Sequence, residues 1–348
     1  MIDVRVIGGG PAGGAAAIRL ARSGRSVRLF EKSRFPRPKL CGGFLSFESF
    51  ADLDDFHVLD ALRRAESPVL RRTVIASRGG RVAESPLPAE ALSVSRATLD
   101  QLLLEEARRC GVEVREGANG LVDAEPAAMT VMATGRSTAG VPLPSSTSYV
   151  GLQALFADMP GVTDQVELDA IASGYVGLAR QREGVNLCAF TTPAVVRRWG
   201  PDMDRVLAQM ATENPVLARH LRAARRVSAW LAVGPVRLGI RQLANGSTFY
   251  VGDAACVVDP FAGEGMSMAL YSARLLTEAL AQIERPAADA YRRLWTRAFL
   301  PSLRWNALIR TIYGIKALQE PSMRLLQWAP KAIHELTALT RYRRLELQ

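Results

Sequence analysis

A glycine-rich loop and an acid that follows it are the residues with the clearest chemistry. Gly8, Gly10 and Gly13 form a G-x-G-x-x-G pattern directly after a short apolar run, and an acid, Glu31, follows 18 residues later. Such a loop lets the backbone approach a pyrophosphate at a helix N-terminus, and the acid accepts hydrogen bonds from ribose hydroxyls. The sequence therefore predicts a dinucleotide site. The acid argues against NADP, whose 2′-phosphate it would repel.

The residues on both sides of this loop predict the strands and the helix that position it. Residues 4–7 predict a buried strand, residues 15–22 an Ala-rich helix and residues 26–31 a second strand. The order of these elements, from the first strand through the loop and helix to the second strand and its acid, is the one expected for a dinucleotide site. The alternative is a glycine-rich turn of another α/β fold. The cofactor contacts predicted from this unit are Gly8, Gly10, Pro11, Ala12, Gly13, Glu31 and Lys32.

A second stretch with chemical potential lies near residue 250. Residues 249–251 predict a strand that ends beside Asp253, whose carboxylate can accept hydrogen bonds from a polyol. Gly263 and Gly265 open a helix predicted over residues 263–284. The first amides of such a helix can meet the electron-rich edge of a ring and stabilise negative charge there. The alternative is a solvated Gly-Asp turn without a ligand.

A third stretch, residues 37–43, reads Arg-Pro-Lys-Leu-Cys-Gly-Gly, a rigid loop whose end can lie close to a flat ligand. Together with the Gly-rich loop, Glu31 and the later Gly-Glu-Gly-Met segment, it resembles the FAD-dependent geranylgeranyl reductases and the related group A flavoprotein hydroxylases. The resemblance implies FAD as the cofactor and places Cys41, Gly42 and Gly43 beside the isoalloxazine ring. The alternative for Cys41 is a small buried residue.

The resemblance assigns further residues to FAD. It gives Asp253 the ribityl chain, and it gives the turn at residues 260–265 the pyrimidine edge of the flavin. Arg96 belongs to an Arg-x-x-Leu-Asp element that contacts FAD; its alternative is a solvated residue at a helix N-terminus. The remaining contacts that the resemblance implies are Arg96, Thr134, Gly135, Gly252, Asp253, Pro260, Gly263, Gly265 and Met266.

The sequence also departs from the family pattern. Residues 133–136 read Ala-Thr-Gly-Arg where hydroxylases usually carry Asp-Gly, so an acid is missing. Gly177 stands where reductases and flavin halogenases carry a Trp, and no Lys lies between Lys39 and Lys316. The Lys that flavin halogenases use therefore has no obvious counterpart, and halogenation ranks low among the reactions considered.

The pattern of elements predicts an α/β fold, with a Rossmann-type FAD-binding domain, an inserted antiparallel-sheet substrate domain and a helical C-terminus. Four short runs between residues 148 and 190 predict the antiparallel sheet, and residues 193–225 read as mostly helical. The predicted division assigns residues 1–75, 91–140 and 240–285 to the FAD-binding domain, residues 76–90 and 141–239 to the substrate domain, and residues 286–348 to a basic amphipathic C-terminal segment.

The net charge of +10 is concentrated in the tail. From residue 285 onward, twelve Arg and Lys face four Asp and Glu, so the preceding residues are nearly neutral. Trp305, Leu308 and Ile312 have near-helical spacing, and a basic amphipathic helix with Trp is typical of a membrane surface or a partner helix. The alternative is a helix packed on the substrate domain with a solvated Arg face. No nucleic-acid-binding module is recognisable, so nucleic acid is not an expected partner.

Composition excludes several other classes. Four scattered Cys without C-x-x-C spacing and three separated His argue against a disulfide framework and a metal site, so no metal is expected. The first residues do not form a signal-peptide pattern, and no run of about 18 apolar residues occurs. We therefore expect a cytoplasmic protein, with association to a membrane surface as an alternative.

These observations predict an FAD-dependent oxidoreductase that acts on a hydrophobic small molecule, with NAD(P)H or an external reductase as the electron donor. The favoured reaction is hydroxylation of an aromatic or lipid-like substrate through a flavin C4a-hydroperoxide. The first alternative is reduction of C=C bonds of a lipid or isoprenoid, with Cys41 or Tyr175 as the catalytic proton donor. The second is a non-catalytic flavin-binding protein at the membrane periphery.

Overall fold

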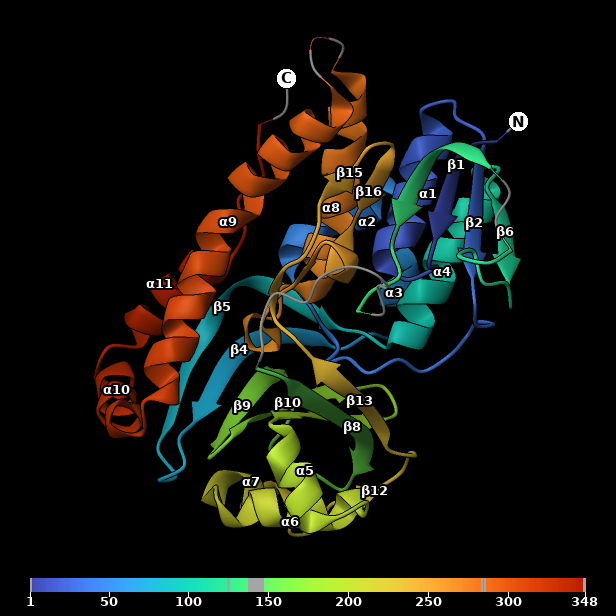
Figure 1. Cartoon of the computed structure of the whole chain (residues 1–348). Helices are drawn as coiled ribbons and strands as arrows, with labels where there is room; N and C mark the ends of the chain where they lie inside the picture. The colour runs from blue at the N-terminus through green and yellow to red at the C-terminus, as the bar shows by residue number, and fades with distance from the viewer. Residues whose placement is uncertain (1, 124–125, 137–146, 283, 285, 347–348) are drawn as a thin grey trace.

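The structure, a computed structural model, describes residues 2–123, 126–136, 147–282, 284 and 286–346, and Figure 1 shows their arrangement. The first of its sheets has six strands. In spatial order they are β15 (Ala244–Asn245), β16 (Thr248–Tyr250), β7 (Ala127–Met132), β1 (Ile2–Ile7), β2 (Val27–Glu31) and β6 (Glu113–Glu116). All neighbours are parallel except β15 and β16. The Rossmann-type sheet expected from the sequence is confirmed.

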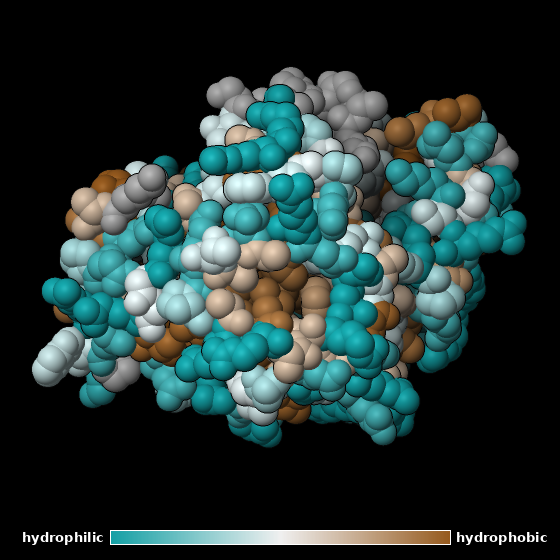
Figure 2. Space-filling view, turned by 90° about the horizontal axis from the view of Figure 1, so that it is seen from below, coloured by the Kyte–Doolittle hydropathy of each residue, from teal (hydrophilic) through white to brown (hydrophobic). Residues whose placement is uncertain are grey.

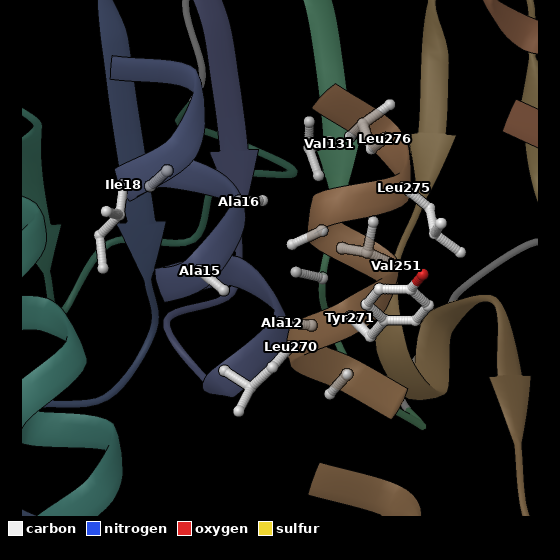
Figure 3. Close-up of a cluster of buried hydrophobic side chains, with 14 of the residues drawn as sticks. Ala12, Ala15, Ala16, Ile18, Val131, Val251, Leu270, Tyr271, Leu275 and Leu276 are labelled. Atoms are coloured by element: carbon white, nitrogen blue, oxygen red, sulfur yellow. The ribbon is translucent and has the colours of Figure 1, made fainter. Parts of the chain in front are cut away.

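Two helices pack closely beside this sheet. α1 (Pro11–Arg22) starts with Pro11, whose fixed φ suits the first helical position. Its buried Ala15 and Ala16 have no side chain beyond Cβ, so α1 approaches α8 (Gly265–Ala281) closely, as Figure 3 shows. The helix predicted over residues 263–284 is thus present but shorter. The pair carries the two glycine-rich turns at adjacent helix N-termini.

The second sheet has nine strands and is mostly antiparallel. In spatial order they are β12 (Arg225–Arg226), β8 (Tyr149–Ala157), β11 (Gly184–Thr191), β10 (Gly174–Gln181), β9 (Gln165–Ile171), β4 (Val69–Ala76), β5 (Val82–Ser93) and β3 (Phe44–Leu45), with β13 (Leu231–Val236) paired to β8. A small sheet joins β14 (Gly239–Ile240) to β17 (Cys256–Val257). Strands β8 to β11 are the four runs predicted between residues 148 and 190.

The pairing of β4 bears on the proposed domain division. β4 pairs with β9 in parallel, so residues 69–76 lie in the second sheet. The division remains a proposal, and this pairing favours a first boundary just before β4 rather than at residue 75. Residues 137–146, which include the proposed boundary at 140/141, lie outside the described residues, as do residues 1, 124, 125, 283, 285, 347 and 348 of the segments assigned above.

Helices predicted over residues 193–225 cover one face of the second sheet. They are α5 (Pro193–Trp199), α6 (Met203–Thr212) and α7 (Pro215–Leu221). Val206 and Leu217 pack on Leu152, Val176 and Leu187 of the strands in one buried cluster. Figure 2 views the molecule from this end and shows a mostly hydrophilic surface with apolar side chains gathered near its middle.

The other helices connect the sheets and complete the C-terminal side. They are α2 (Phe50–Asp55), α3 (Leu59–Arg64), α4 (Arg96–Arg109), α9 (Ala287–Gly314), α10 (Lys316–Trp328) and α11 (Pro330–Thr340). Tyr291, Trp295 and Phe299 of α9 are buried near α8, whereas Met323 of α10 and Ile333 of α11 pack on β5. The tail is therefore packed on the body along its inner side. Among the described residues, no helix is long and apolar enough to cross a bilayer.

Candidate functional site

One large cavity collects residues from both sheets and from the C-terminal helices. Its volume is about 700 Å³, within the range of small-molecule sites. It runs from the loop after β1 to the inner faces of α9, α10 and α11. The predicted site residues that line it are Gly10, Pro11, Ala12, Cys41, Gly42, Gly43, Arg96, Gly135, Tyr175, Asp253, Pro260, Gly263, Gly265 and Met266. The sequence motifs therefore converge on one place.

The other predicted residues lie outside the cavity wall. They are Gly8, Gly13, Glu31, Lys32, Thr134 and Gly252. Glu31 is buried at the end of β2, where its carboxylate accepts hydrogen bonds from the amides of Gly9 at 2.8 Å and Ser33 at 3.0 Å. Lys32 is exposed, so its contact with a cofactor stays a prediction without support from the geometry.

The first glycine-rich loop depends on its missing side chains. A Cβ at Gly13 would lie 1.8 Å from the carbonyl oxygen of Gly8, which excludes any other residue without movement of the backbone. A Cβ at Gly10 would lie 3.3 Å from Nη2 of Arg96 and 3.7 Å from Nζ of Lys39. The loop thus presents bare backbone to two cations at the start of α1, an arrangement suited to a diphosphate.

Two acids, Asp100 and Asp253, attract the cations beside the loop. Arg96 donates two hydrogen bonds of 2.7 Å to Asp100, and both side chains are buried. Burial alone would lower the pKa of Arg96, but the attraction and hydrogen bonds of Asp100 outweigh it and raise that pKa. Burial, followed by repulsion from Arg96, lowers the pKa of Lys39 to about 8, although Asp100 and Asp253 oppose the shift. Lys39 was not singled out from the sequence, although it belongs to the Arg-x-Lys-x-Cys-Gly-Gly motif.

The Cys-Gly-Gly segment is fixed by amide side chains of the second sheet. The amide of Cys41 donates to Gln153 Oε1 at 2.8 Å, and Asn186 Nδ2 donates to the carbonyl oxygen of Cys41 at 2.9 Å. Gln153 and Asn186 also bond to each other at 2.8 Å. Gly43 has φ +80°, and a Cβ there would lie 2.5 Å from Gln181 Nε2. Strands β8, β10 and β11 therefore set the position of this wall of the cavity.

Aromatic side chains of the second sheet form another part of the cavity wall. Tyr149 and Phe190 are stacked with ring centroids 4.6 Å apart, and Tyr175 lies 5.8 Å from Phe190. The Tyr175 hydroxyl is buried and has no hydrogen-bond partner among the described residues. Burial, with a smaller contribution from Asp259, raises the pKa of Tyr175 well above its usual range, so the hydroxyl keeps its proton. Burial likewise raises the pKa of Cys188 to about 12, so that thiol stays neutral.

The second glycine-rich turn closes the cavity at the start of α8. Gly263 has φ +68°, and a Cβ there would lie 2.6 Å from the Phe44 ring. Gly265 begins α8, so the N-terminus of this helix lines the cavity through Gly265 and Met266, next to Gly263. Glu264, between the glycines, is buried and ion-paired to Arg341. Sequence reasoning did not identify Arg341, because it lies 77 residues from its partner and belongs to no motif.

A comparison with protein-family models decides what this arrangement is. A model of the FAD binding domain matches residues 1–140, which contain the first loop, Glu31, the Cys-Gly-Gly segment and Arg96. The match identifies residues 1–140 as an FAD-binding domain. The protein is an FAD-dependent oxidoreductase, and the resemblance found in its motifs is confirmed at this level.

Individual relatives of this flavoprotein differ in their reactions. It is 29% identical to the menaquinone reductase of Mycolicibacterium smegmatis, over 79% of this chain and 75% of the relative. Its fold is similar to that of the flavin-dependent brominase Bmp2, with a TM-score of 0.80, 17% identity and coverage of 100% and 96% of the two chains. The p-nitrophenol 4-monooxygenase PnpA of Pseudomonas putida gives a TM-score of 0.78, 17% identity and coverage of 99% of each chain. These similarities do not determine the reaction of this chain.

The described residues of the flavoprotein fit FAD. The bare backbone at Gly10 beside Arg96 and Lys39 suits the pyrophosphate, and Asp253 on the cavity wall suits the ribityl hydroxyls. The buried Thr134 hydroxyl lacks a protein partner among the described residues, but Thr134 lies outside the cavity wall, so this hydroxyl does not indicate where a ligand lies. Within the part of the chain that the structure describes, no group of His, Cys, Asp and Glu could hold a metal ion.

Proposed function

We propose that this flavoprotein reduces a C=C bond of a hydrophobic, lipid-like molecule. FAD, when bound, supplies two-electron chemistry, taken from NAD(P)H or an external reductase. The observation that carries the proposal is the Tyr175 hydroxyl, which is buried, unpartnered among the described residues and located on an apolar cavity wall. Such a hydroxyl can donate the proton that completes the addition across a double bond. The similarity to a menaquinone reductase, named for a hydrophobic substrate, supports this reading.

The rest of the chain orients the substrate and excludes water. Apolar side chains of β4 and β9 and of the C-terminal helices line the far part of the cavity, among them Ile75, Leu168, Ile309, Leu326 and Leu336. This lining favours a long apolar tail over a polar substrate. The stacked rings of Tyr149 and Phe190 line the same cavity as Cys41 and give it a flat apolar surface for the reacting group.

Hydroxylation, which the sequence favoured, is the second candidate. The same aromatic wall of Tyr149, Tyr175 and Phe190 suits an electron-rich ring, and it keeps the reacting centre dry.

Stopped-flow kinetics and product analysis separate the two reactions. The holoenzyme is reduced anaerobically, then mixed with a prenylated quinone or a phenol, each with and without oxygen. Reduction of a prenyl C=C bond predicts a product that stays two hydrogen atoms heavier after any hydroquinone has been reoxidised to the quinone. This product should form without oxygen, and the reduced enzyme should react slowly with oxygen. Product that forms only with oxygen and gains one oxygen atom would replace the first proposal by the second. If neither substrate class changes the rate of flavin reoxidation, a non-catalytic flavin protein becomes the better reading.

We also infer that the C-terminal helices contact an anionic membrane surface. Leu325 is 63% exposed and Trp328 is 89% exposed on α10, and Trp305, Leu308 and Ile312 form an exposed face of α9. Arg297, Arg304, Arg324 and Lys331 are exposed near them in sequence, which supplies charge complementary to anionic lipids.

Co-sedimentation with vesicles tests this contact. The double variant Leu325→Ser/Trp328→Ser should bind anionic vesicles several-fold more weakly than the native chain. The matched control is Leu121→Ser/Val122→Ser, which removes two exposed apolar residues outside the C-terminal helices. Equal sedimentation of all three proteins would remove the membrane from the list of partners.

A further inference from the structure

A short segment after α11, residues 341–345, returns to the FAD-binding side of the molecule. Arg341 forms a hydrogen-bonded ion pair with Glu264, and the amide of Tyr342 lies 3.4 Å from the other oxygen of that carboxylate. Arg344 donates to Asp52 at 2.9 Å, and the amide of Leu345 donates to the Tyr271 hydroxyl at 2.7 Å. Four successive contacts of this kind describe a built junction rather than a loose tail.

The junction meets the cavity at Phe44. The Arg341 guanidinium lies 5.4 Å from the centroid of the Phe44 ring, and Gly263 packs on the same ring. Phe44 directly follows the Cys-Gly-Gly segment, and both Arg341 and Phe44 line the cavity. The segment at residues 41–44, the turn at 263–265 and Arg341 are therefore in mutual contact.

Glu264 is the buried charge on which this contact depends. Its side chain is 1% exposed and that of Arg341 is 10% exposed. Burial raises the pKa of Glu264 to about 7, while Arg341 opposes that shift and Glu48 adds to it. Glu48 is itself buried, 3.8 Å from Nε of Arg341. The positive charge of Arg341 thus compensates two buried acids, Glu48 and Glu264, next to the turn at residues 263–265.

We propose that Arg341 is a positioning residue for the flavin: through Glu264 it holds the Gly263–Gly265 turn and the start of α8 where the cofactor requires them. The proposal goes beyond the reaction assigned above and does not depend on it, because it concerns FAD binding alone. Without Arg341 the ionised Glu264 would be buried without compensation, and the turn would have to move toward water.

The test measures the dissociation constant of FAD for the full-length chain, by flavin fluorescence, from pH 6 to pH 8. In Arg341→Met, FAD should bind at least about tenfold more weakly at pH 8 than in the native chain, because one buried partner has been removed. The deficit should shrink toward pH 6, since protonation of Glu264 removes the uncompensated charge. Burial raises the pKa of Glu264, so the buried site favours the protonated carboxyl, and FAD binding to Arg341→Met should improve as the pH falls.

Two further variants separate positioning from a general loss of structure. Arg344→Met removes the neighbouring ion pair to Asp52 but no cavity residue, so it should lower the melting temperature and leave the pH profile of FAD binding unchanged. The double variant Arg341→Met/Glu264→Gln should bind FAD more tightly than Arg341→Met at pH 8, without the pH-dependent deficit. If Arg341→Met does not fold, the FAD affinity of the double variant is compared with that of the native chain instead. An unchanged FAD affinity in Arg341→Met, the same pH profile in Arg344→Met, or no gain in the double variant would overturn the proposal.

Discussion

The two ends of the cavity are built by different means. At the cofactor end, bare glycine backbone meets paired charges, as in the loop at Gly8–Gly13 beside Arg96 and Asp100. At the substrate end, side chains from β4, β9, β10, β11 and the C-terminal helices meet, and few of them are charged. A backbone-built site tolerates few substitutions and binds one conserved chemical shape, whereas a side-chain-built site can change with each residue. The difference explains how similar folds can carry different reactions.

The largest expected effect comes from the backbone at the cofactor end. Gly13→Ala would place a methyl group 1.8 Å from the Gly8 carbonyl oxygen, so the loop must open. We expect FAD content to fall to about a tenth of the native value or less, because overpacking of this size displaces the backbone. The measurement is the absorbance ratio of flavin to protein after purification. Gly246→Ala is the control, because its Cβ meets nothing within 4 Å and Gly246 does not line the cavity; equal losses in both would contradict a backbone-built site.

The paired charges come next. Arg96→Met leaves the buried Asp100 uncompensated, and we expect the free energy of unfolding to fall by about 3–5 kcal/mol, with weaker FAD binding. Denaturant unfolding of the apo-protein measures the first effect. Arg63→Met is the control, because the Arg63–Asp60 pair is exposed and should contribute at most about 1 kcal/mol. If Arg96→Met lowered the free energy of unfolding no more than Arg63→Met does, the buried Arg96–Asp100 pair would not stabilise this end of the cavity.

At the substrate end, one hydroxyl should matter to the reaction and not to stability. Tyr175→Phe removes a buried group without a partner among the described residues, so the free energy of unfolding should stay within about 1 kcal/mol of the native value or rise. If Tyr175 donates the proton, turnover should fall about a hundredfold while FAD content is unchanged. Steady-state kinetics and a thermal melt check the two statements; full turnover in the variant would assign the proton to another group.

The smallest effect concerns pH at the cofactor end. Burial lowers the pKa of Lys39 to about 8 in the free protein, so Lys39 loses its charge above that pH. The FAD pyrophosphate favours the charged form, hence binding takes up a proton, and FAD affinity should fall by up to about tenfold per pH unit above pH 8. Titrations in the native chain and in Lys39→Met measure this slope. A native slope as flat as that of Lys39→Met would show that Lys39 does not meet the diphosphate.

Parts of the molecule that depend on local backbone chemistry could be predicted from the sequence. The loop at Gly8–Gly13, the start of α8 at Gly265 and strands β8 to β11 all follow from short patterns of glycines or alternating apolar residues. Lys39 could also have been predicted as a site residue, since it lies in the Arg-Pro-Lys-Leu-Cys-Gly-Gly segment. Its lowered pKa, however, depends on burial and on the neighbouring charges of Arg96 and Asp253, which only the structure shows.

Contacts between distant segments could not be predicted in the same way. The parallel pairing of β4 with β9 joins residues about ninety positions apart, and no local pattern specifies the partner of a strand. The contact of Arg341 with Glu264 is of the same kind, because Arg341 belongs to no motif and lies 77 residues from Glu264 in the sequence. The stacking of Tyr149 on Phe190 likewise depends on the register of β8 against β11.

The return of residues 341–345 to the FAD-binding side has a consequence for the order in which the protein is made. A ribosome releases the chain from its N-terminus at a limited rate, so the Gly8–Gly13 loop and the six-stranded sheet can assemble well before Arg341 emerges. Until then Glu264 lacks its cation, and the wall around the start of α8 is incomplete. Tight capture of the cofactor would therefore be a late event in biosynthesis, delayed until this segment has left the ribosome.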